Sequence, residues 1–346
     1  MTLASGDVAA SAATSTRQTV HRGPWATAMR KLRRDHAAMT ALAALVLIIL
    51  VCVAAPLYAN GVAHTDPFAS NLSGSITLNG QDVPIMAAET EGLGLGTTPL
   101  GPTWTGQYFF GADSQGRDVM ARLLYGGRNS LIIAGSATML TLVLAALVGI
   151  VAGFFGGWTD AVLSRLLDVL WAFPVFLLAI SLSIVTIGHG LAIGPFTIAS
   201  DSLLLPIAII GIIYVPYVAR PIRGQVLQLK QSEFVLAATG LGVPPWRILW
   251  VDILPNVMST LIVFAPLTIA LNMIIESALS FLSIGVQSPA ASWGTIIEDG
   301  QGLLYTRPLV AIAPGIAIVL TVLSLNVFGD GVRDALDPRA KLRVRD

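Results

Sequence analysis

The stretch LIIAGSATMLTLVLAALVGIVAGFF, residues 131–155, contains no charged side chain. About 20 apolar residues in a helix cross a bilayer core of about 30 Å. Five further runs have a comparable length once tilt and soft boundaries are allowed: 37–58, 166–187, 203–218, 257–282 and 309–328. Hydrocarbon cannot form hydrogen bonds with backbone amides, so a spanning segment must be a helix or part of a closed β-barrel. The alternating pattern of a membrane barrel is absent. The runs therefore predict an all-α integral membrane protein with six transmembrane helices.

The overall composition agrees with a membrane protein. Hydrophobic residues make up 54% of the 346 residues, charged residues make up 12%, and the mean hydropathy is +0.75. Such a chain has too little polar surface to coat a soluble globule. The formal net charge is zero, which gives no indication of a nucleic-acid partner.

The first apolar run, 37–58, follows a basic cluster at 30–34, an arrangement that signal peptides and membrane anchors share. The run is long enough to span, and the segment before it is longer than a typical signal n-region. We therefore expect an uncleaved first transmembrane helix, with a cleaved signal peptide as the alternative. Residues 1–36 then form a tail, whose first 20 or so residues, rich in Ala, Ser and Thr, are expected to be disordered.

The basic residues predict the orientation of the spans. With a cytoplasmic N-terminus, all but four of the 20 Lys and Arg residues lie on the cytoplasmic side. The four external ones are Arg117, Arg122, Arg128 and Arg307. We expect both termini in the cytoplasm, an extracytoplasmic segment at 59–130, a spanning core at 131–329 and a cytoplasmic tail at 330–346.

The extracytoplasmic segment contains one turn signal. Asn79-Gly80 lies between two short stretches with strand character, 75–78 and 82–85, and this pattern is typical of a tight β-hairpin. An irregular loop rich in Gly and Pro is the alternative.

Glycines and prolines recur within the predicted spans. Gly149, Gly153 and Gly157 follow a GxxxG spacing that lets two helices approach closely. Prolines remove backbone hydrogen bonds, so we expect kinks at some of these positions: Pro174, Pro206, Pro216, Pro266 and Pro314.

The chain lacks the residues of a catalytic or cofactor site. Its three lysines follow Arg30, Leu229 and Ala340, so no Gly-Lys-Ser/Thr phosphate loop exists, and any ATP must be hydrolysed by a partner. The four histidines have no zinc-site spacing, and Cys52 is the only cysteine. We therefore expect a non-catalytic protein that binds no cofactor or metal ion.

Two acidic residues fall within predicted spans, where an ionised carboxylate costs several kcal/mol. Asp168 lies near the cytoplasmic end of the third span, one turn after Arg165, which could pair with it. Glu276 lies deep in the fifth span. Glu276 either takes part directly in transport, as in an ion-coupled carrier, or forms a structural hydrogen bond to a neighbouring helix or subunit.

The loop between the fourth and fifth spans, 220–256, is the most informative cytoplasmic segment. Ser232 is a suitable N-cap for a short helix over 233–239, and Gly240 and Gly242 end that helix.

A second short helix follows in the same loop. Pro244-Pro245 suits its first turn, it continues to Trp250, and 254–256 closes the unit. The two helices carry the apolar side chains of Phe234, Leu236, Trp246, Ile248, Leu249 and Trp250. This surface requires a cover, either the lipid interface or the groove of a partner protein.

The loop resembles the EAA motif of bacterial ABC importer permeases. Ala237-Ala238, Gly242 and Leu254-Pro255 stand at the spacings of that motif. The chain departs from it at Leu236, where the consensus has Glu, and at Asp252, where Ile or His is frequent.

Further stretches look like the C-type membrane subunit of the dipeptide, oligopeptide and nickel permeases. They occur in the family's order from Gly111 to Arg339: 111–119, 122–131, 168–174, 276–282, 292–294 and 328–339. The external stretch 72–107 is longer than is usual for this group. Glu276 lies in a motif shared by ATP-driven importers, which disfavours the ion-coupled carrier.

The resemblance implies a subunit of a type I ABC importer in a bacterial cell membrane. Its partners would be a second, B-type permease subunit, two ATP-binding subunits that use ATP and Mg²⁺, and an extracytoplasmic substrate-binding protein. The implied cargo is short peptides, with nickel chelates, glutathione or another small solute as alternatives. The residues implied in coupling to the ATPases are Glu233, Leu236, Ala237, Ala238, Gly242, Pro244, Arg247 and Pro255.

Overall fold

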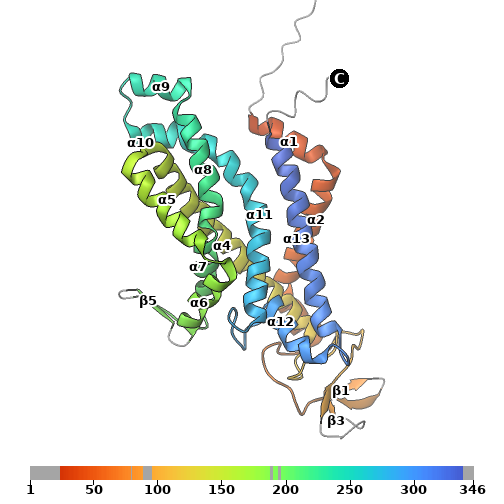
Figure 1. Ribbon diagram of the computed structural model, residues 1–346. Helices are drawn as coiled ribbons and strands as arrows, with labels where there is room; N and C mark the ends of the chain where they lie inside the picture. The colour runs from red at the N-terminus through yellow and green to blue at the C-terminus, as the bar shows by residue number, and fades with distance from the viewer. Residues whose placement is uncertain (1–23, 79, 89–95, 188–189, 194–195, 338–346) are drawn as a thin grey trace, which may run out of the picture.

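The computed structural model describes residues 24–78, 80–88, 96–187, 190–193 and 196–337. The tail expected to be disordered, residues 1–20, lies outside the described residues. Long helices dominate the described chain (Figure 1).

Four helices are each long and apolar enough to cross a membrane. They are α2 (His36–Val53), α4 (Val119–Phe155), α13 (Leu309–Leu336) and a continuous helix from Pro245 to Phe281 that contains α11 (Leu254–Phe281). They correspond to the apolar runs expected from the sequence at 37–58, 131–155, 257–282 and 309–328. A helix suits such runs because most of its backbone hydrogen bonds are formed within the segment.

Two further candidate spans are pairs of helices with a sharp bend between them, unlike the single helices expected at 166–187 and 203–218. Helices α5 (Gly157–Ala172) and α6 (Val175–Ile187) meet at 89°, and α7 (Leu204–Ile213) and α8 (Val215–Lys230) meet at 43°. Counting each pair as one span gives six among the described residues.

Prolines explain both breaks. Phe173, directly before Pro174, is extended at φ −87° and ψ 137°, as the clash with a following proline ring favours. Pro216 lies in the first turn of α8, where its missing N–H removes a bond that would have continued α7. Pro266 and Pro314 instead lie inside uninterrupted helices.

Among the described residues, the strands form three separate antiparallel pairs. They pair β1 (Ser75–Leu78) with β2 (Gln81–Pro84), β3 (Met86–Ala88) with β4 (Thr97–Pro99), and β5 (Leu191–Ile193) with β6 (Phe196–Ile198). Leu78 pairs with Gln81, so the first hairpin turns between these two residues, as the sequence predicts. Gly80 has φ +81°, which suits a glycine in such a tight turn.

The helices run between two ends of different character (Figure 1). One end carries α1 (Pro24–Arg34), α9 (Glu233–Gly240) and both termini of the described chain, and we call it the α9 end. The opposite α12 end carries α12 (Trp293–Gly300) and strands β1 to β4.

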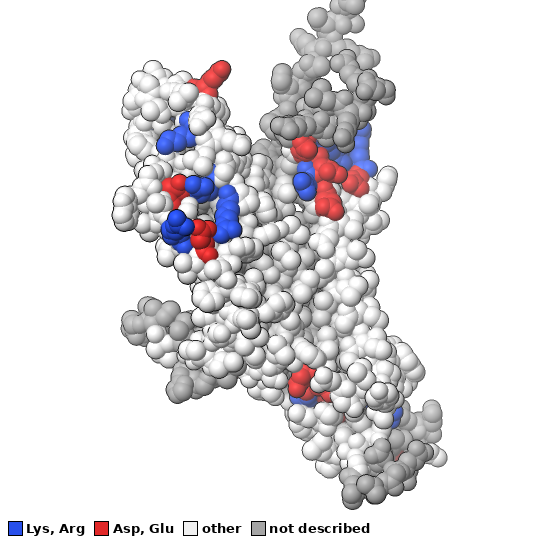
Figure 2. Space-filling model, viewed as in Figure 1, with Lys and Arg blue, Asp and Glu red and all other residues white. Residues whose placement is uncertain are grey.

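On the face that Figure 2 shows, charged side chains gather toward the two ends and leave an uncharged belt between them. Apolar side chains on the spanning helices point outward, among them Leu50 (60% exposed), Leu147 (55%) and Val319 (63%). An uncharged belt with outward apolar side chains is what contact with lipid requires.

Helices α4 and α8 approach each other closely at two glycines. A Cβ atom at Gly149 would lie 2.8 Å from the Ala219 carbonyl oxygen, and one at Gly153 would lie 2.9 Å from that of Arg223. The GxxxG prediction is therefore confirmed for this pair, because only glycine permits such an approach. It is wrong for Gly157, which begins α5 at φ +55° and has open space beside it.

Candidate coupling site

The loop predicted to contact a partner folds as two short helices at the α9 end. The first helix is α9, and the second is α10 (Pro245–Ile248), with Gly242 at φ +74° between them. Ser232 occupies the N-cap of α9 with extended backbone, but its hydroxyl donates to the Leu229 carbonyl and does not cap the helix. The left-handed turn at Gly242 allows the chain to reverse within a few residues.

The second helix is longer than the sequence suggests. Helix α10 continues through a π-helical segment, η2 (Leu249–Ile253), directly into α11, so 254–256 does not close the unit. Pro255 lies in the first turn of α11. The wider π turn before it removes the need for the N–H that proline lacks.

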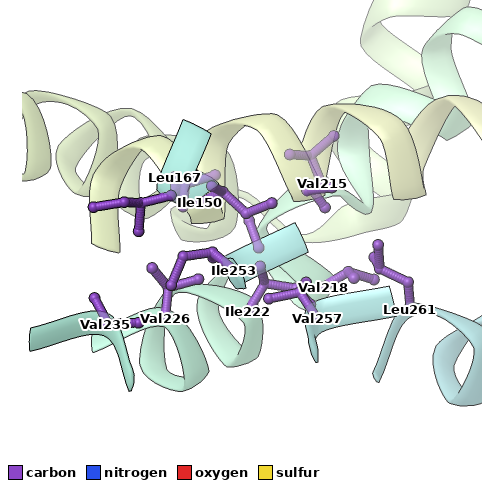
Figure 3. Close-up of a cluster of buried hydrophobic side chains, with 14 residues drawn as sticks. Ile150, Leu167, Val215, Val218, Ile222, Val226, Val235, Ile253, Val257 and Leu261 are labelled. Carbon is purple, nitrogen blue, oxygen red and sulfur yellow. The ribbon is translucent and has the colours of Figure 1, made fainter. Parts of the chain in front are cut away.

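The inner face of this helix pair is fixed to the membrane bundle. Val235 of α9, Ile248 of α10 and Ile253 of η2 are at most 2% exposed. They pack in one cluster with Ile222 and Val226 of α8 (Figure 3). The loop is thereby joined to α4 and α8, whose close contact is described above.

The outer face of the same unit is apolar and uncovered. Leu241 is 84% exposed, Trp246 is 65% and Leu236 is 58%. Phe234 and Trp250 are also exposed. Ile248, which the sequence placed on this surface, is buried, and Leu249 is only partly exposed.

The residues predicted to couple to a partner divide between the two faces. Ala238 packs against the buried cluster. The others lie on the exposed side of the unit or beside it: Glu233, Leu236, Ala237, Gly242, Pro244, Arg247 and Pro255.

Asp168 forms an ion pair on α5 at the molecular surface. Its carboxylate accepts a hydrogen bond from Arg220 Nη2 at 2.9 Å, whereas the predicted partner Arg165 is 3.8 Å away. The Asp168 side chain is 52% exposed, so it is not the buried acid of a proton path. On the same two helices, Asp160 accepts a bond of 2.6 Å from Arg223 Nη2.

Glu276 is buried, at 1% exposure, near the α12 end of α11. Its carboxylate accepts a hydrogen bond of 2.9 Å from Ser280 Oγ on the next turn. The hydroxyls of Ser130 on α4 and Ser292 at the start of α12 also face it. The Glu276 carboxylate thus lies at the junction of α4, α11 and the start of α12.

A buried ionic cluster at the α12 end was missed by the sequence analysis. Arg117 and Arg122 are each 2% exposed and both donate to the carboxylate of Asp299 on α12, at 2.9 Å and 2.8 Å. Asp113, at 1% exposure, accepts a bond of 2.7 Å from Arg117 Nε. The stretch 111–119 carried a family resemblance, but nothing in its sequence indicated a partner on α12.

No group of three or more potential metal ligands occurs in the part of the chain that the structure describes. The long helices, the two bent helix pairs and the α9–α10 unit instead agree with what comparison with known proteins shows. A family model described as "Binding-protein-dependent transport system inner membrane component" matches residues 145–342. The chain belongs to this family.

This inner membrane component also matches, over residues 23–74, a model described as the N-terminal TM domain of oligopeptide transport permease C. It is 36% identical to the oligopeptide transport system permease protein OppC of Bacillus subtilis, over 92% of this chain and 90% of that protein. It is 32% identical to the dipeptide transport system permease protein DppC of Alkalihalophilus pseudofirmus, over 92% and 91%.

A third relative of this permease is the glutathione transport system permease protein GsiD of Escherichia coli O6:K15:H31, which is 36% identical over 92% of each chain. Among solved structures, the permease resembles a chain of the MetNI methionine ABC transporter in an inward-facing conformation, with a TM-score of 0.50. That likeness covers 63% of this chain and 97% of the other at 18% identity, and it shows the fold alone.

Proposed function

We propose that this permease is the C-type subunit of an ATP-driven importer of short peptides. It forms half of the translocation path beside a B-type permease subunit. Two separate ATP-binding subunits hydrolyse ATP with Mg²⁺, and an extracytoplasmic binding protein delivers the cargo. The family membership and the dipeptide and oligopeptide relatives support this proposal.

The α9–α10 unit carries the proposal for coupling. Its inner face is held in the bundle by Val235, Ile248 and Ile253, while Leu236, Leu241 and Trp246 project from the outer face without a cover. A partner groove that receives an amphipathic helix would bury such a face. The ATP-binding subunits are the partners that the family requires there, so the α9 end lies in the cytoplasm and both termini with it.

The proposed cycle uses the attachment of this unit to the spans. Closure of the ATPase pair on ATP moves α9 and α10 together, and the buried contacts of Ile248 and Ile253 pass the motion to α8 and α11. ATP acts through its different affinity for the inward-open and outward-open states, and hydrolysis resets them.

Reconstitution with the partner subunits tests the assignment. The four-subunit complex should copurify and import dialanine or trialanine into proteoliposomes in an ATP-dependent, vanadate-sensitive manner when the binding protein is present. The permease without ATPases should transport nothing. Uphill uptake by the permease alone on an ion gradient would reject the proposal.

Glutathione is the second candidate cargo, because a relative of equal identity is named for it. Nickel chelates remain a third candidate from the sequence resemblance. A binding titration of the cognate receptor against dialanine, trialanine, glutathione and nickel separates them, since the receptor selects what the permease receives.

A further inference from the structure

A groove of about 320 Å³ runs between α8, α11 and α13 toward the α9 end. It opens where the molecule divides into two lobes, one with α5 and α8 and one with α13 (Figures 1 and 2). Charged side chains gather on both lobes near this opening. The volume is at the lower end of the range for small-molecule sites, as expected if a second subunit supplies the facing wall.

One wall of the groove is aromatic. Tyr217 of α8 and Phe264 of α11 both line it, with ring centroids 5.8 Å apart at 87°. Trp171 of α5 stacks on Tyr217 with ring centroids 6.3 Å apart, and the Arg220 guanidinium lies 5.7 Å from the centroid of the Trp171 ring. Aromatic rings contact side chains of many shapes and lose little conformational entropy in doing so.

The opposite wall is polar and comes from α13. Asn326, Asp330 and Arg333 line it at successive turns. Among the residues that the structure describes, none of these three side chains has a hydrogen-bond or ion-pair partner. Asn326 lies about 15 Å before the end of α13, at 1.5 Å per residue. An amide at that depth needs a polar partner, because hydrocarbon supplies none.

We propose that this groove is the permease's half of a binding subsite for a short zwitterionic peptide on the translocation path. Asp330 faces the terminal ammonium, Arg333 faces the terminal carboxylate, Asn326 bonds to the peptide amide, and Tyr217 and Phe264 contact the side chains. The subsite rests on the proposed function for the identity of its cargo. A helix of the second permease subunit is the competing occupant.

Thiol accessibility separates a water-filled path from a protein-filled one. Cys52, which is 3% exposed, is replaced by alanine, and Asn326→Cys is compared with Leu323→Cys. Leu323 lies one turn earlier on α13 and is 56% exposed, but it does not line the groove. Both are treated with 2-sulfonatoethyl methanethiosulfonate in the complete, nucleotide-free transporter, and modification is read by a gel shift of this chain.

The subsite predicts that the cysteine at 326 reacts and the cysteine at 323, facing lipid, does not. Trialanine at millimolar concentration should slow the reaction at 326 at least threefold. A cysteine at 326 that is inert in the nucleotide-free and ATP-bound states would overturn the proposal, because the groove would then be filled by another helix or by lipid. Reaction without protection by a peptide that the complex imports would overturn it as well.

Charge removal provides a second measurement. Asp330→Asn and Arg333→Gln should each lower ATP-dependent peptide uptake at least fivefold. Asp334→Asn is the matched control, since Asp334 is exposed on the same helix and does not line the groove. Unchanged uptake by both groove variants would count against the subsite.

The two proposals fail differently. If the wild-type complex imports glutathione or another solute and no alanine peptide, the peptide cargo is wrong, and protection at 326 is measured with the imported solute. Protection by a non-peptide solute would place that solute in the groove and reject the peptide chemistry assigned to it.

Discussion

Arg122 and Asp299 donate and accept a hydrogen bond of 2.8 Å, although 177 residues separate them in the sequence. Arg117 binds the same carboxylate, and Asp113 lies behind both guanidinium groups. The cluster therefore joins α4 and the segment before it to α12, with the Asp113, Arg117 and Arg122 side chains at most 2% exposed and that of Asp299 18% exposed.

Asp299→Asn should destabilise the permease by about 3 kcal/mol, because it leaves two buried guanidinium groups with one carboxylate. The expected result is a lower midpoint in thermal unfolding of the detergent-solubilised complex. Asp201→Asn, at an exposed acid in the loop before α7, is the control. Equal midpoints for the two variants would show that the cluster contributes little.

Gly149→Leu should disrupt the contact of α4 with α8. Its Cβ atom would lie 2.8 Å from backbone, so the helices must separate, at a cost of about 1–3 kcal/mol for overpacking alone. Gly135→Leu on the same helix meets nothing within 4 Å and should behave like wild type. The yield of monodisperse complex in size-exclusion chromatography measures the difference. An equal loss for both variants would indicate a general intolerance of α4 to leucine.

Gly242→Val should uncouple ATP hydrolysis from uptake while the permease still inserts in the membrane. A β-branched residue at φ +74° is strained by more than about 1 kcal/mol, so the turn that sets α9 against α10 must change. Gly240→Val is the comparison, because Gly240 ends α9 with open space around it and without a positive φ. The ratio of peptide imported to ATP hydrolysed is the readout. Normal coupling in Gly242→Val would remove the turn from the coupling path.

Glu276→Gln should lower the unfolding midpoint slightly and leave peptide uptake and its pH profile unchanged. A glutamine keeps a carbonyl oxygen that can accept the bond from Ser280 Oγ, so the junction of α4, α11 and α12 persists. Glu276→Leu, which leaves the serine hydroxyls without an acceptor, should unfold more readily. Loss of uptake in Glu276→Gln at normal stability would instead support the direct role in transport that the sequence left open.

The spans were predictable because apolar length is a local property. The bends at Pro174 and Pro216 were predictable only as kinks, because the angle depends on the helices that pack around each break. The position of the coupling loop was also predictable from local signals, above all from Gly242, which ends its first short helix. Its division into a buried and an exposed face was not, since the cluster that buries Val235 and Ile248 includes Ile150 of α4, which is far from both in the chain.

Two features lay beyond sequence reasoning for different reasons. The ionic cluster requires knowledge of a contact between Arg122 and Asp299, and charge patterns within a loop cannot supply it. The fusion of α10 with α11 contradicted a local signal, because Leu254-Pro255 resembles a helix end. The π-helical segment tolerates that proline. Such segments have no clear sequence signature, so the continuous helix was not predictable.

The uninterrupted helix from Pro245 to Phe281 has a mechanical consequence. It measures about 55 Å at 1.5 Å per residue, so a single rod reaches from Trp246, where the ATPases are proposed to push, to Glu276 beside α12. A tilt imposed at Trp246 would move the residues near Glu276 as well, because the helix has no break between these two positions. In the proposed cycle, the α12 end can therefore respond to nucleotide through leverage alone, with no relay of separate side-chain rearrangements.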